Sequence, residues 1–179
     1  MPVRVVIAED EWLIAAALRR QLESCGCDVL AAVGTGARAV AVACAEHPDL
    51  VLMDVQMPEM DGLEATRRLM EQSPTCVVIV TGKARQEGAA EQAGAMDCVM
   101  KPLMSGRIPA LAENARRRFM RFAALDREGS DHGEALQAWV VLRRAVKALM
   151  ESDGLTEDQA FDRLEAQKRG RRILAGAVA

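Results

Sequence analysis

Three carboxylates and one lysine stand where apolar runs of this sequence end. Asp54 closes one run, Glu9 and Asp10 follow an earlier run, and Lys101 follows a later run. A carboxylate at the mouth of a buried strand is costly unless a metal or a cation accompanies it. Because this chain offers both kinds of partner, we interpret Asp54 as a nucleophile that accepts a phosphoryl group and forms an acyl phosphate.

The neighbouring residues suit the chemistry of such a site. Crowded carboxylates repel one another and need a cation, and Mg²⁺ takes oxygen ligands while it keeps several waters. The Lys101 ammonium and the metal would neutralise the charge on the phosphoryl oxygens. Thr81, which also ends an apolar run, would donate a hydrogen bond to one of those oxygens. Movement of Thr81 toward the phosphoryl group would then change the shape of the protein surface in response to phosphorylation of Asp54.

An alternation of strand and helix patterns positions these residues. Short apolar runs predict strands at residues 3–8, 29–33, 50–53, 76–80 and 98–100. Helical spacing of apolar residues predicts helices at 12–24, 37–46, 63–72 and 85–93. Strands that alternate with helices form a parallel sheet with helices on both faces. Ligands bind such sheets beyond the carboxyl ends of the strands, where all five residues named above are expected.

The first half of the chain resembles the receiver domains of two-component response regulators. The resemblance covers roughly residues 3–104 and is carried by Ala8-Glu9-Asp10, Met53-Asp54, Met57-Pro58-Glu59-Met60-Asp61-Gly62, Val80-Thr81-Gly82, Gly94-Ala95 and Lys101-Pro102. It implies a flavodoxin-like, doubly wound, five-stranded parallel sheet.

The same resemblance implies a role for each matching residue. Asp54 would be the phosphoacceptor, phosphorylated by a sensor histidine kinase or a phosphotransfer protein. Glu9, Asp10, Asp54 and the backbone carbonyl of Gln56 would hold Mg²⁺. Thr81 and Lys101 fall on the hydroxyl and lysine positions of the family.

Two features depart from the family pattern. Receivers usually carry Tyr or Phe on the fifth strand, at the position that Cys98 occupies here. The segment between Thr81 and Gly94 is about a turn shorter than usual, so we expect a stunted fourth helix. We also expect a cis peptide bond before Pro102, since X-Pro bonds are the usual site of cis bonds.

The second half has helical patterns only. Residues 110–127 form either the last receiver helix, extended into a linker, or a coiled coil that forms a homodimer. Residues 128–133 are a break. Residues 134–150 and 157–167 predict two further helices, and residues 173–178 form a weak final apolar segment.

The sequence from Ala145 through Leu149-Met150 to Gly154-Leu155-Thr156-Glu157 and Leu164 resembles the ANTAR module of transcription antiterminators. That module is a small three-helix RNA-binding unit, and an RNA hairpin is the partner implied. Here the lysine of its Ala-Lys-Gly motif is displaced to Lys147. We expect Trp139 and Phe161 to be core residues. Basic side chains that could meet phosphates are Arg143, Arg144, Lys147, Lys168, Arg169, Arg171 and Arg172.

Composition excludes several classes of protein. In a chain of 179 residues no apolar stretch approaches the roughly 18 that a membrane span needs, and no signal peptide precedes the first strand, so we expect a cytoplasmic protein. The five cysteines lack the spacing of zinc ligands and are expected to be reduced thiols. Residues 1–104 carry 9 Lys/Arg and 15 Asp/Glu, whereas residues 105–179 carry 14 and 11, which indicates an acidic regulatory half and a basic effector half.

These patterns predict a receiver at 1–106, a helical linker at 107–133 and an all-α, three-helix ANTAR-like domain at 134–179. The predicted function is a phosphorylation-controlled response regulator, not an enzyme, whose output binds RNA in transcription antitermination. The alternative is a regulator whose C-terminal module acts through protein contacts and binds no RNA. DNA binding is a weaker rival, because no convincing helix-turn-helix is present.

Overall fold

The computed structural model describes residues 2–103, 108–126 and 132–176, and within these the side chains of 109, 122–139 and 168–176 lie outside the description. The chain divides into two compact units, Met1–Leu136 and Gln137–Ala179. The predicted helix at 110–127 therefore belongs with the first unit and not to a separate linker at 107–133.

The first unit is built on one parallel sheet with the strand order β2-β1-β3-β4-β5. Its strands are β1 Arg4–Ala8, β2 Asp28–Val33, β3 Leu50–Asp54, β4 Val77–Thr81 and β5 Asp97–Met100. β1 and β3 are buried on both faces, as expected for apolar runs in a doubly wound sheet. The strand order changes direction between β1 and β3, which places the switch point of the sheet beside Asp54.

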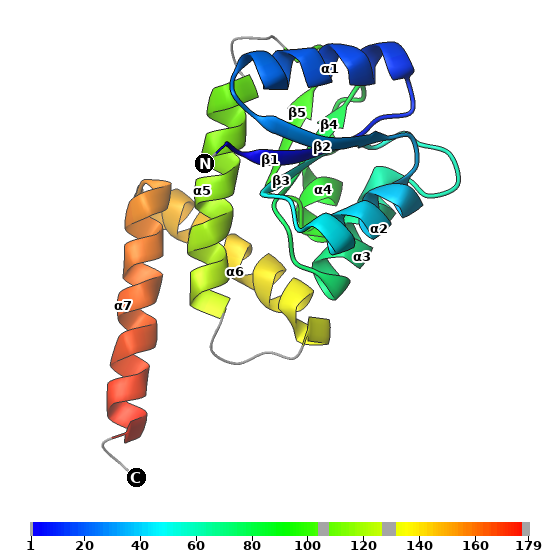
Figure 1. The fold of residues 1–179 in the computed structure, drawn as a ribbon. Coiled ribbons are helices and arrows are strands. Elements are labelled where there is room, and N and C mark those ends of the chain that lie inside the picture. Colours follow the sequence, from blue (N-terminus) through cyan, green and yellow to red (C-terminus); the bar gives the residue numbers. More distant parts are fainter. Residues whose placement is uncertain (1, 104–107, 127–131, 177–179) are drawn as a thin grey trace. The chain divides into compact units, whose positions relative to one another are not determined.

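Helices cover both faces of this sheet (Figure 1). They are α1 Trp12–Ser24, α2 Gly36–Glu46, α3 Gly62–Gln72, α4 Glu87–Ala93 and α5 Ile108–Asp126. α1 contacts α5 on one face, and α2, α3 and α4 pack in sequence on the other. The predicted doubly wound fold is confirmed, and α4 is short, at 7 residues, as expected from the short segment after Thr81. The predicted cis bond between Lys101 and Pro102 is also present.

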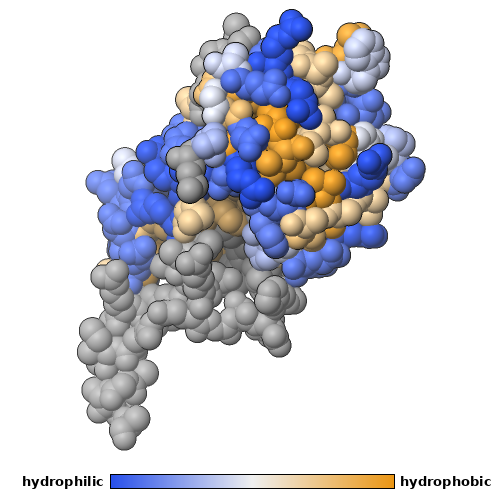
Figure 2. Space-filling model, in the orientation of Figure 1, coloured by the Kyte–Doolittle hydropathy of each residue, from blue (hydrophilic) through white to orange (hydrophobic). Residues whose placement is uncertain are grey.

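The core between sheet and helices consists of small and branched apolar residues. Buried alanines of α2 and α3 allow close approach to the sheet, and the cluster includes Val6, Val51, Met53 and Ile79. On the face seen in Figure 2, apolar side chains gather over β2 and α2, where Leu30, Ala31 and Val42 are only partly buried. β2 is an edge strand of the sheet, which explains why this apolar region is incompletely covered.

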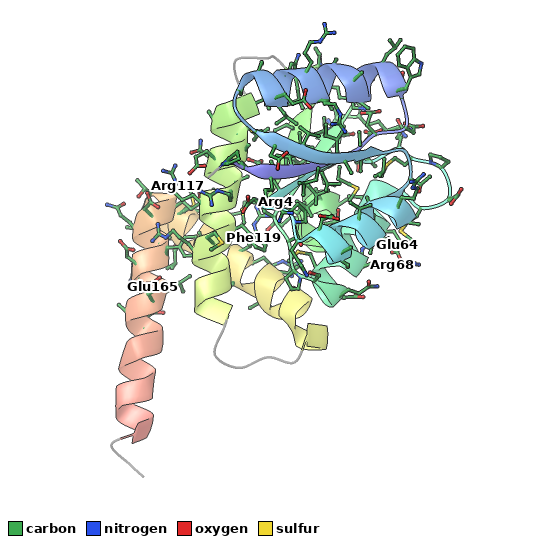
Figure 3. All side chains as sticks on the ribbon, in the orientation of Figure 1. Arg4, Glu64, Arg68, Arg117, Phe119 and Glu165 are labelled. Atoms are coloured by element: carbon green, nitrogen blue, oxygen red, sulfur yellow. The ribbon has the colours of Figure 1, made fainter. Side chains whose placement is uncertain are left out.

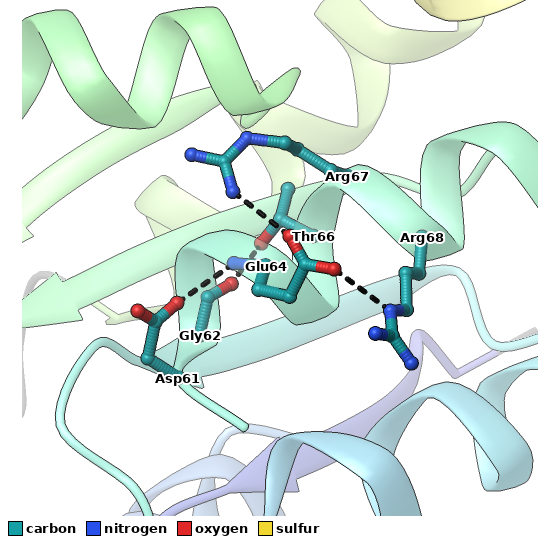
Figure 4. A network of polar contacts seen from close by, with 6 residues as sticks. All are labelled: Asp61, Gly62, Glu64, Thr66, Arg67 and Arg68. Atoms are coloured by element: carbon teal, nitrogen blue, oxygen red, sulfur yellow. Dashed lines mark hydrogen bonds and ion pairs between the residues drawn. The ribbon is translucent and has the colours of Figure 1, made fainter. Parts of the chain in front are cut away.

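α3 begins directly after the loop that follows Asp54, the phosphoacceptor candidate at the end of β3. The Asp61 carboxylate caps it by accepting a hydrogen bond from the Glu64 backbone N–H at 2.8 Å. Glu64 in turn pairs with Arg67 at 3.0 Å and with Arg68 at 2.8 Å (Figure 4). Figure 3 labels Glu64 and Arg68 on α3. The hydrogen bond from Arg68, followed by that from Arg67, lowers the pKa of Glu64. These contacts are exposed to water, which screens them, so the side-chain cap chiefly fixes where α3 starts.

The second unit contains most of α6 His132–Asp153 and all of α7 Glu157–Gly176. A reciprocal capping box starts α7: the Thr156 N–H donates to Gln159 Oε1 at 2.9 Å, and the Gln159 N–H donates to Thr156 Oγ1 at 3.3 Å. Phe161 is 1% exposed, so the prediction that it is a core residue is confirmed. The side chain of Trp139 lies outside the described residues.

The prediction of three helices in 134–179 is wrong for the described part of that range, which holds α6 and α7 alone. The helix expected to end near 167 continues to Gly176 and absorbs the start of the apolar segment at 173–178. Gly170 is the only helix-weakening residue between 168 and 175. One interior glycine costs only about 1 kcal/mol, which the arginines, leucine and alanine around it can offset.

Candidate functional site

The sheet brings the predicted site residues to one edge. Asp54 is the last residue of β3, Thr81 the last of β4, and Glu9 and Asp10 follow β1. The register pairs Ala8 with Met53, so Glu9 leaves its strand beside Asp54. The Glu9 N–H donates to the Val33 carbonyl at 2.8 Å, which fixes the backbone from which its side chain extends.

Lys101 is the cation of this site and contacts two carboxylates. Its Nζ lies 2.6 Å from Glu9 Oε2 and 3.2 Å from Asp54 Oδ1. The lysine side chain is 19% exposed, whereas the two carboxylates are 2% and 7% exposed. The Lys101 N–H donates to the Thr81 carbonyl at 2.8 Å, so the backbone of the lysine is held against the end of β4.

Burial and charge oppose each other at these groups. Burial is the largest effect on Asp54 and on Glu9, and it raises the pKa of both carboxyls although Lys101 acts to lower it. Burial also favours the neutral form of Lys101, but its hydrogen bond to Glu9 and the nearby charge of Asp54 outweigh burial and raise its pKa. The site thus contains carboxylates that are incompletely compensated and would gain from a further cation.

The donor set fits a small divalent metal ion. Glu9, Asp10 and Asp54 each present a carboxylate oxygen, and these oxygens lie within 4.8 Å of one another. Asp10 is exposed while the other two are buried, which leaves the cluster a side open to water. Mg²⁺ prefers oxygen ligands and keeps part of its water shell, so these residues suit it. Gln56 lies in the loop after β3, two residues beyond Asp54.

Thr81 is 1% exposed, and its hydroxyl accepts a hydrogen bond from the Lys83 N–H at 3.0 Å. Because the oxygen is used as an acceptor, its own O–H remains able to donate to another oxygen. In the register Asp54 pairs with Val80, the residue before Thr81. The hydroxyl therefore starts from the strand adjacent to the candidate phosphoacceptor.

Gly62, which the sequence marks only as the last residue of the motif from Met57 to Gly62, lies against the backbone of Asp54. A Cβ at this position would lie 1.9 Å from the Asp54 carbonyl oxygen and 2.9 Å from the Asp54 carbonyl carbon. The Gly62 N–H also donates to the Val55 carbonyl at 3.0 Å. The first residue of α3 therefore packs directly on the backbone of Asp54, and the glycine after the capping Asp61 was the available signal.

β5 carries Cys98 and Asp97, which lie at the start of this strand. Cys98, at the position where the family carries an aromatic residue, is partly buried, and burial together with Glu87 and Asp97 raises its pKa to about 11. The neighbouring Asp97 Oδ2 lies 3.6 Å from Arg118 Nη1. This ion pair connects β5 with α5, and the sequence reading did not predict it because the two residues are far apart in the chain.

The predicted RNA-contacting residues divide into two groups. Arg143, Arg144 and Lys147 lie within about one turn of α6, and Arg144 and Lys147 are exposed. Lys168, Arg169, Arg171 and Arg172 belong to α7, but their side chains lie outside the described residues. In the described part of the chain neither Arg144 nor Lys147 has an acidic partner. Among the described helices none is long and apolar enough to cross a membrane.

Strand order and acidic edge together define a flavodoxin-like α/β domain with its site at the switch point of the sheet. The family model for the response regulator receiver domain matches residues 5–113. The signal receiver domain of a modulated diguanylate cyclase from Desulfovibrio desulfuricans G20 superposes with a TM-score of 0.62 at 29% identity, over 67% of this chain and 98% of that one. The chain therefore belongs to the response regulator receiver family.

Two curated relatives show how far the likeness extends. Transcriptional regulatory protein PdtaR of Mycobacterium tuberculosis is 35% identical over 182 residues, which covers 100% of this chain and 88% of the relative. A protein-glutamate methylesterase/protein-glutamine glutaminase of Cupriavidus metallidurans is 42% identical, but over 58% of this chain and 32% of the relative. The likeness to the enzyme is thus confined to about the length of the receiver, whereas the likeness to the regulatory protein includes the second unit.

Proposed function

We propose that this response regulator is switched by phosphorylation of Asp54 in the presence of Mg²⁺. The observation that carries the proposal is the grouping of three carboxylate oxygens within 4.8 Å, with Lys101 Nζ at 3.2 Å from Asp54. Mg²⁺ bound by Glu9, Asp10, Asp54 and the Gln56 carbonyl would offset negative charge on the phosphoryl group.

Asp54, Lys101 and Thr81 would each have a separate role in the transfer of the phosphoryl group. A carboxylate oxygen of Asp54 attacks the phosphorus and forms the O–P bond of an acyl phosphate. The N–P bond to the donor, a histidine of a sensor kinase or phosphotransfer protein, breaks, and the imidazole leaves and takes up a proton. The Lys101 ammonium pairs with a phosphoryl oxygen, and the Thr81 hydroxyl donates a hydrogen bond to another.

The phosphorylation proposal is tested with acetyl phosphate and Mg²⁺. Intact-mass spectrometry of the full chain should show one added phosphoryl group that disappears with EDTA and in the Asp54→Asn variant. Asp28→Asn is the matched control, since Asp28 is an exposed carboxylate at the start of β2. Equal labelling of the two variants would overturn the assignment of Asp54.

We infer further that the second unit binds hairpin RNA and acts in transcription antitermination. This inference is supported by the resemblance of residues 136–178 to the ANTAR module and by the full-length similarity to a transcriptional regulatory protein. It is also supported by Arg144 and Lys147, which are exposed cations on α6 without acidic partners in the described part of the chain. Cations of this kind can pair with RNA phosphates and release counterions.

The RNA proposal is tested with a pool of hairpin RNAs that carry random loops. Binding should weaken as salt rises, and Arg144→Ala with Lys147→Ala should lower the slope of log K against log salt by roughly 0.7 to 0.9 for each lost contact. Arg67→Ala with Arg68→Ala removes the same charge from α3 and should leave the slope unchanged. Absence of binding at low salt would instead favour the alternative, a regulator that acts through protein contacts.

A further inference from the structure

The helix α2 begins with a glycine that its backbone conformation does not require. Gly36 is the first residue of α2 and is buried, and Thr35 caps the helix by accepting a hydrogen bond from the Arg38 N–H at 3.3 Å. The φ angle of Gly36 is not in the left-handed region that favours glycine. Because alanine is the better helix former, the glycine must have another cause.

That cause is the space taken by the loop between β3 and α3. A Cβ at position 36 would lie 2.5 Å from the Met60 carbonyl oxygen and 3.1 Å from Met60 Cγ. It would also lie 3.0 Å from the Cβ of Ala65, a fully buried residue of α3. A backbone oxygen and a Cβ cannot rotate away as the end of a long side chain can. The Met60 carbonyl would therefore have to move by about 1 Å to restore an ordinary contact.

The part of the loop that Gly36 contacts is a tight turn. The Met60 N–H donates to the Pro58 carbonyl at 2.8 Å, and Glu59 between them has a φ of +68°, which non-glycine residues rarely adopt. A backbone of this kind persists only where its surroundings fix it. We therefore expect the turn from Pro58 to Met60 to move as one unit when the Met60 carbonyl is displaced.

The other end of the same loop is fixed by α3. The Gly62 N–H donates to the Val55 carbonyl at 3.0 Å, directly after Asp54. Gln56, whose carbonyl is a proposed ligand of Mg²⁺, lies between Val55 and the turn at Met60. Mg²⁺ demands near-ideal octahedral geometry, so a carbonyl that is displaced with the turn is a poorer ligand.

We propose that Gly36 is a positioning residue for the Mg²⁺ site and acts on it through the Met60 carbonyl. The absence of a side chain lets the start of α2 pack on the turn at Met60, and this contact sets where the Gln56 carbonyl lies. The proposal rests on the proposed binding of Mg²⁺ beside Asp54. It adds a residue outside the acidic cluster, on a helix that supplies no proposed ligand, on which the affinity of that site depends.

Calorimetry on the full chain tests this role with Gly36→Ala, at a temperature at which urea denaturation shows every variant to be folded. Gly36→Ala should weaken Mg²⁺ binding about 10-fold, as is usual when a residue that supports a metal ligand is altered. Leu22→Ala is the matched control for lost stability, because Leu22 is fully buried in the last turn of α1, about 15 Å along that helix from Trp12. The control should bind Mg²⁺ as the wild type does. Equal affinities of the two variants, whether unchanged or equally reduced, would overturn the role of Gly36.

A second measurement on the unaltered chain does not depend on the folding of variants. The Ala39 N–H donates to the Thr35 carbonyl at 3.0 Å in the first turn of α2, and the Ala160 N–H makes the equivalent bond to Thr156 at 2.9 Å in α7. Mg²⁺ should slow amide exchange of Ala39, because it holds the loop against α2, and should leave that of Ala160 unchanged. Unaltered exchange of Ala39 at saturating Mg²⁺ would refute the coupling of α2 to the site, whereas a wild type that does not bind Mg²⁺ would refute the proposed function itself.

Discussion

Replacing Gly62 by alanine should damage the protein and the site together. The added Cβ would lie 1.9 Å from the Asp54 carbonyl oxygen, and atoms at such a contact must move apart by about 1.5 Å before they reach an ordinary separation. The obstacle is backbone at the end of a central strand, which cannot rotate away as a side chain can. Overpacking of this kind costs about 1–3 kcal/mol, and we expect the upper end.

Two smaller effects modify the expected loss of folding stability in Gly62→Ala. Movement of α3 away from Asp54 would weaken the hydrogen bond from the Gly62 N–H to the Val55 carbonyl, worth about 1 kcal/mol. Alanine is a better helix former than glycine, which returns up to about 1 kcal/mol. These two terms nearly cancel, so the net loss for Gly62→Ala is about 3 kcal/mol.

Urea denaturation of the full chain measures this loss through the midpoint of the receiver transition. Gly88→Ala is the matched control, because Gly88 lies in α4 and a Cβ there would meet nothing within 4 Å. The control should be neutral or more stable by up to about 1 kcal/mol. Phosphorylation of Gly62→Ala by acetyl phosphate should also slow, since the backbone of Asp54 is displaced. Equal stabilities of the two variants would refute the close approach of α3 to Asp54.

Four further predictions concern Cys98, Thr156 and Arg118. The Cys98 pKa of about 11, against an ordinary 9.0, means that iodoacetamide should alkylate Cys98 about 100-fold more slowly at pH 8 than an ordinary thiol; a rate like that of the denatured protein would contradict this. Because the folded pKa exceeds the unfolded one, Cys98 should also contribute stability below pH 9 that is lost as pH rises to about 11, an effect absent in Cys98→Ala urea titrations. Thr156→Ala should destabilise the start of α7 by about 1 kcal/mol, measured as faster amide exchange there, and Thr156→Ser should not; equal exchange in both would exclude the capping box. Arg118→Ala should change stability by less than about 1 kcal/mol, because both partners of the Asp97 ion pair are partly exposed, and a larger loss in urea would show that the pair is coupled to the core.

Much of the first unit followed from the sequence because its strands are short apolar runs with site residues at their ends. The order of strand and helix patterns predicted the sheet, and its carboxyl edge predicted where Asp54, Thr81 and Lys101 meet. Contacts between side chains were not predictable in this way. That Lys101 lies closer to Glu9 than to Asp54 depends on side-chain length and rotamers, and the hydropathy pattern contains neither.

The second unit was harder to predict because its boundaries depend on small differences in free energy. The basic stretch after 167 looked like an end of helix, yet α7 continues to Gly176 because no proline interrupts it. The helix expected either as the last receiver helix, extended into a linker, or as a coiled coil groups with the receiver, where Ile108, Ala112 and Ala115 are each 1% exposed. Burial of one apolar face is decided by tertiary packing, whereas the same spacing of residues would also suit a dimer.

The central claim is that the phosphoryl group is attached to the carboxylate of Asp54. After treatment of the full chain with acetyl phosphate and Mg²⁺, borohydride reduces an acyl phosphate of aspartate to homoserine, which mass spectrometry of peptides can locate. The structure predicts homoserine at position 54 only, where the carboxylate is buried beside Lys101. Homoserine at position 10 or 61, or none in a folded protein that binds Mg²⁺, would contradict the assignment of Asp54 as the phosphoacceptor.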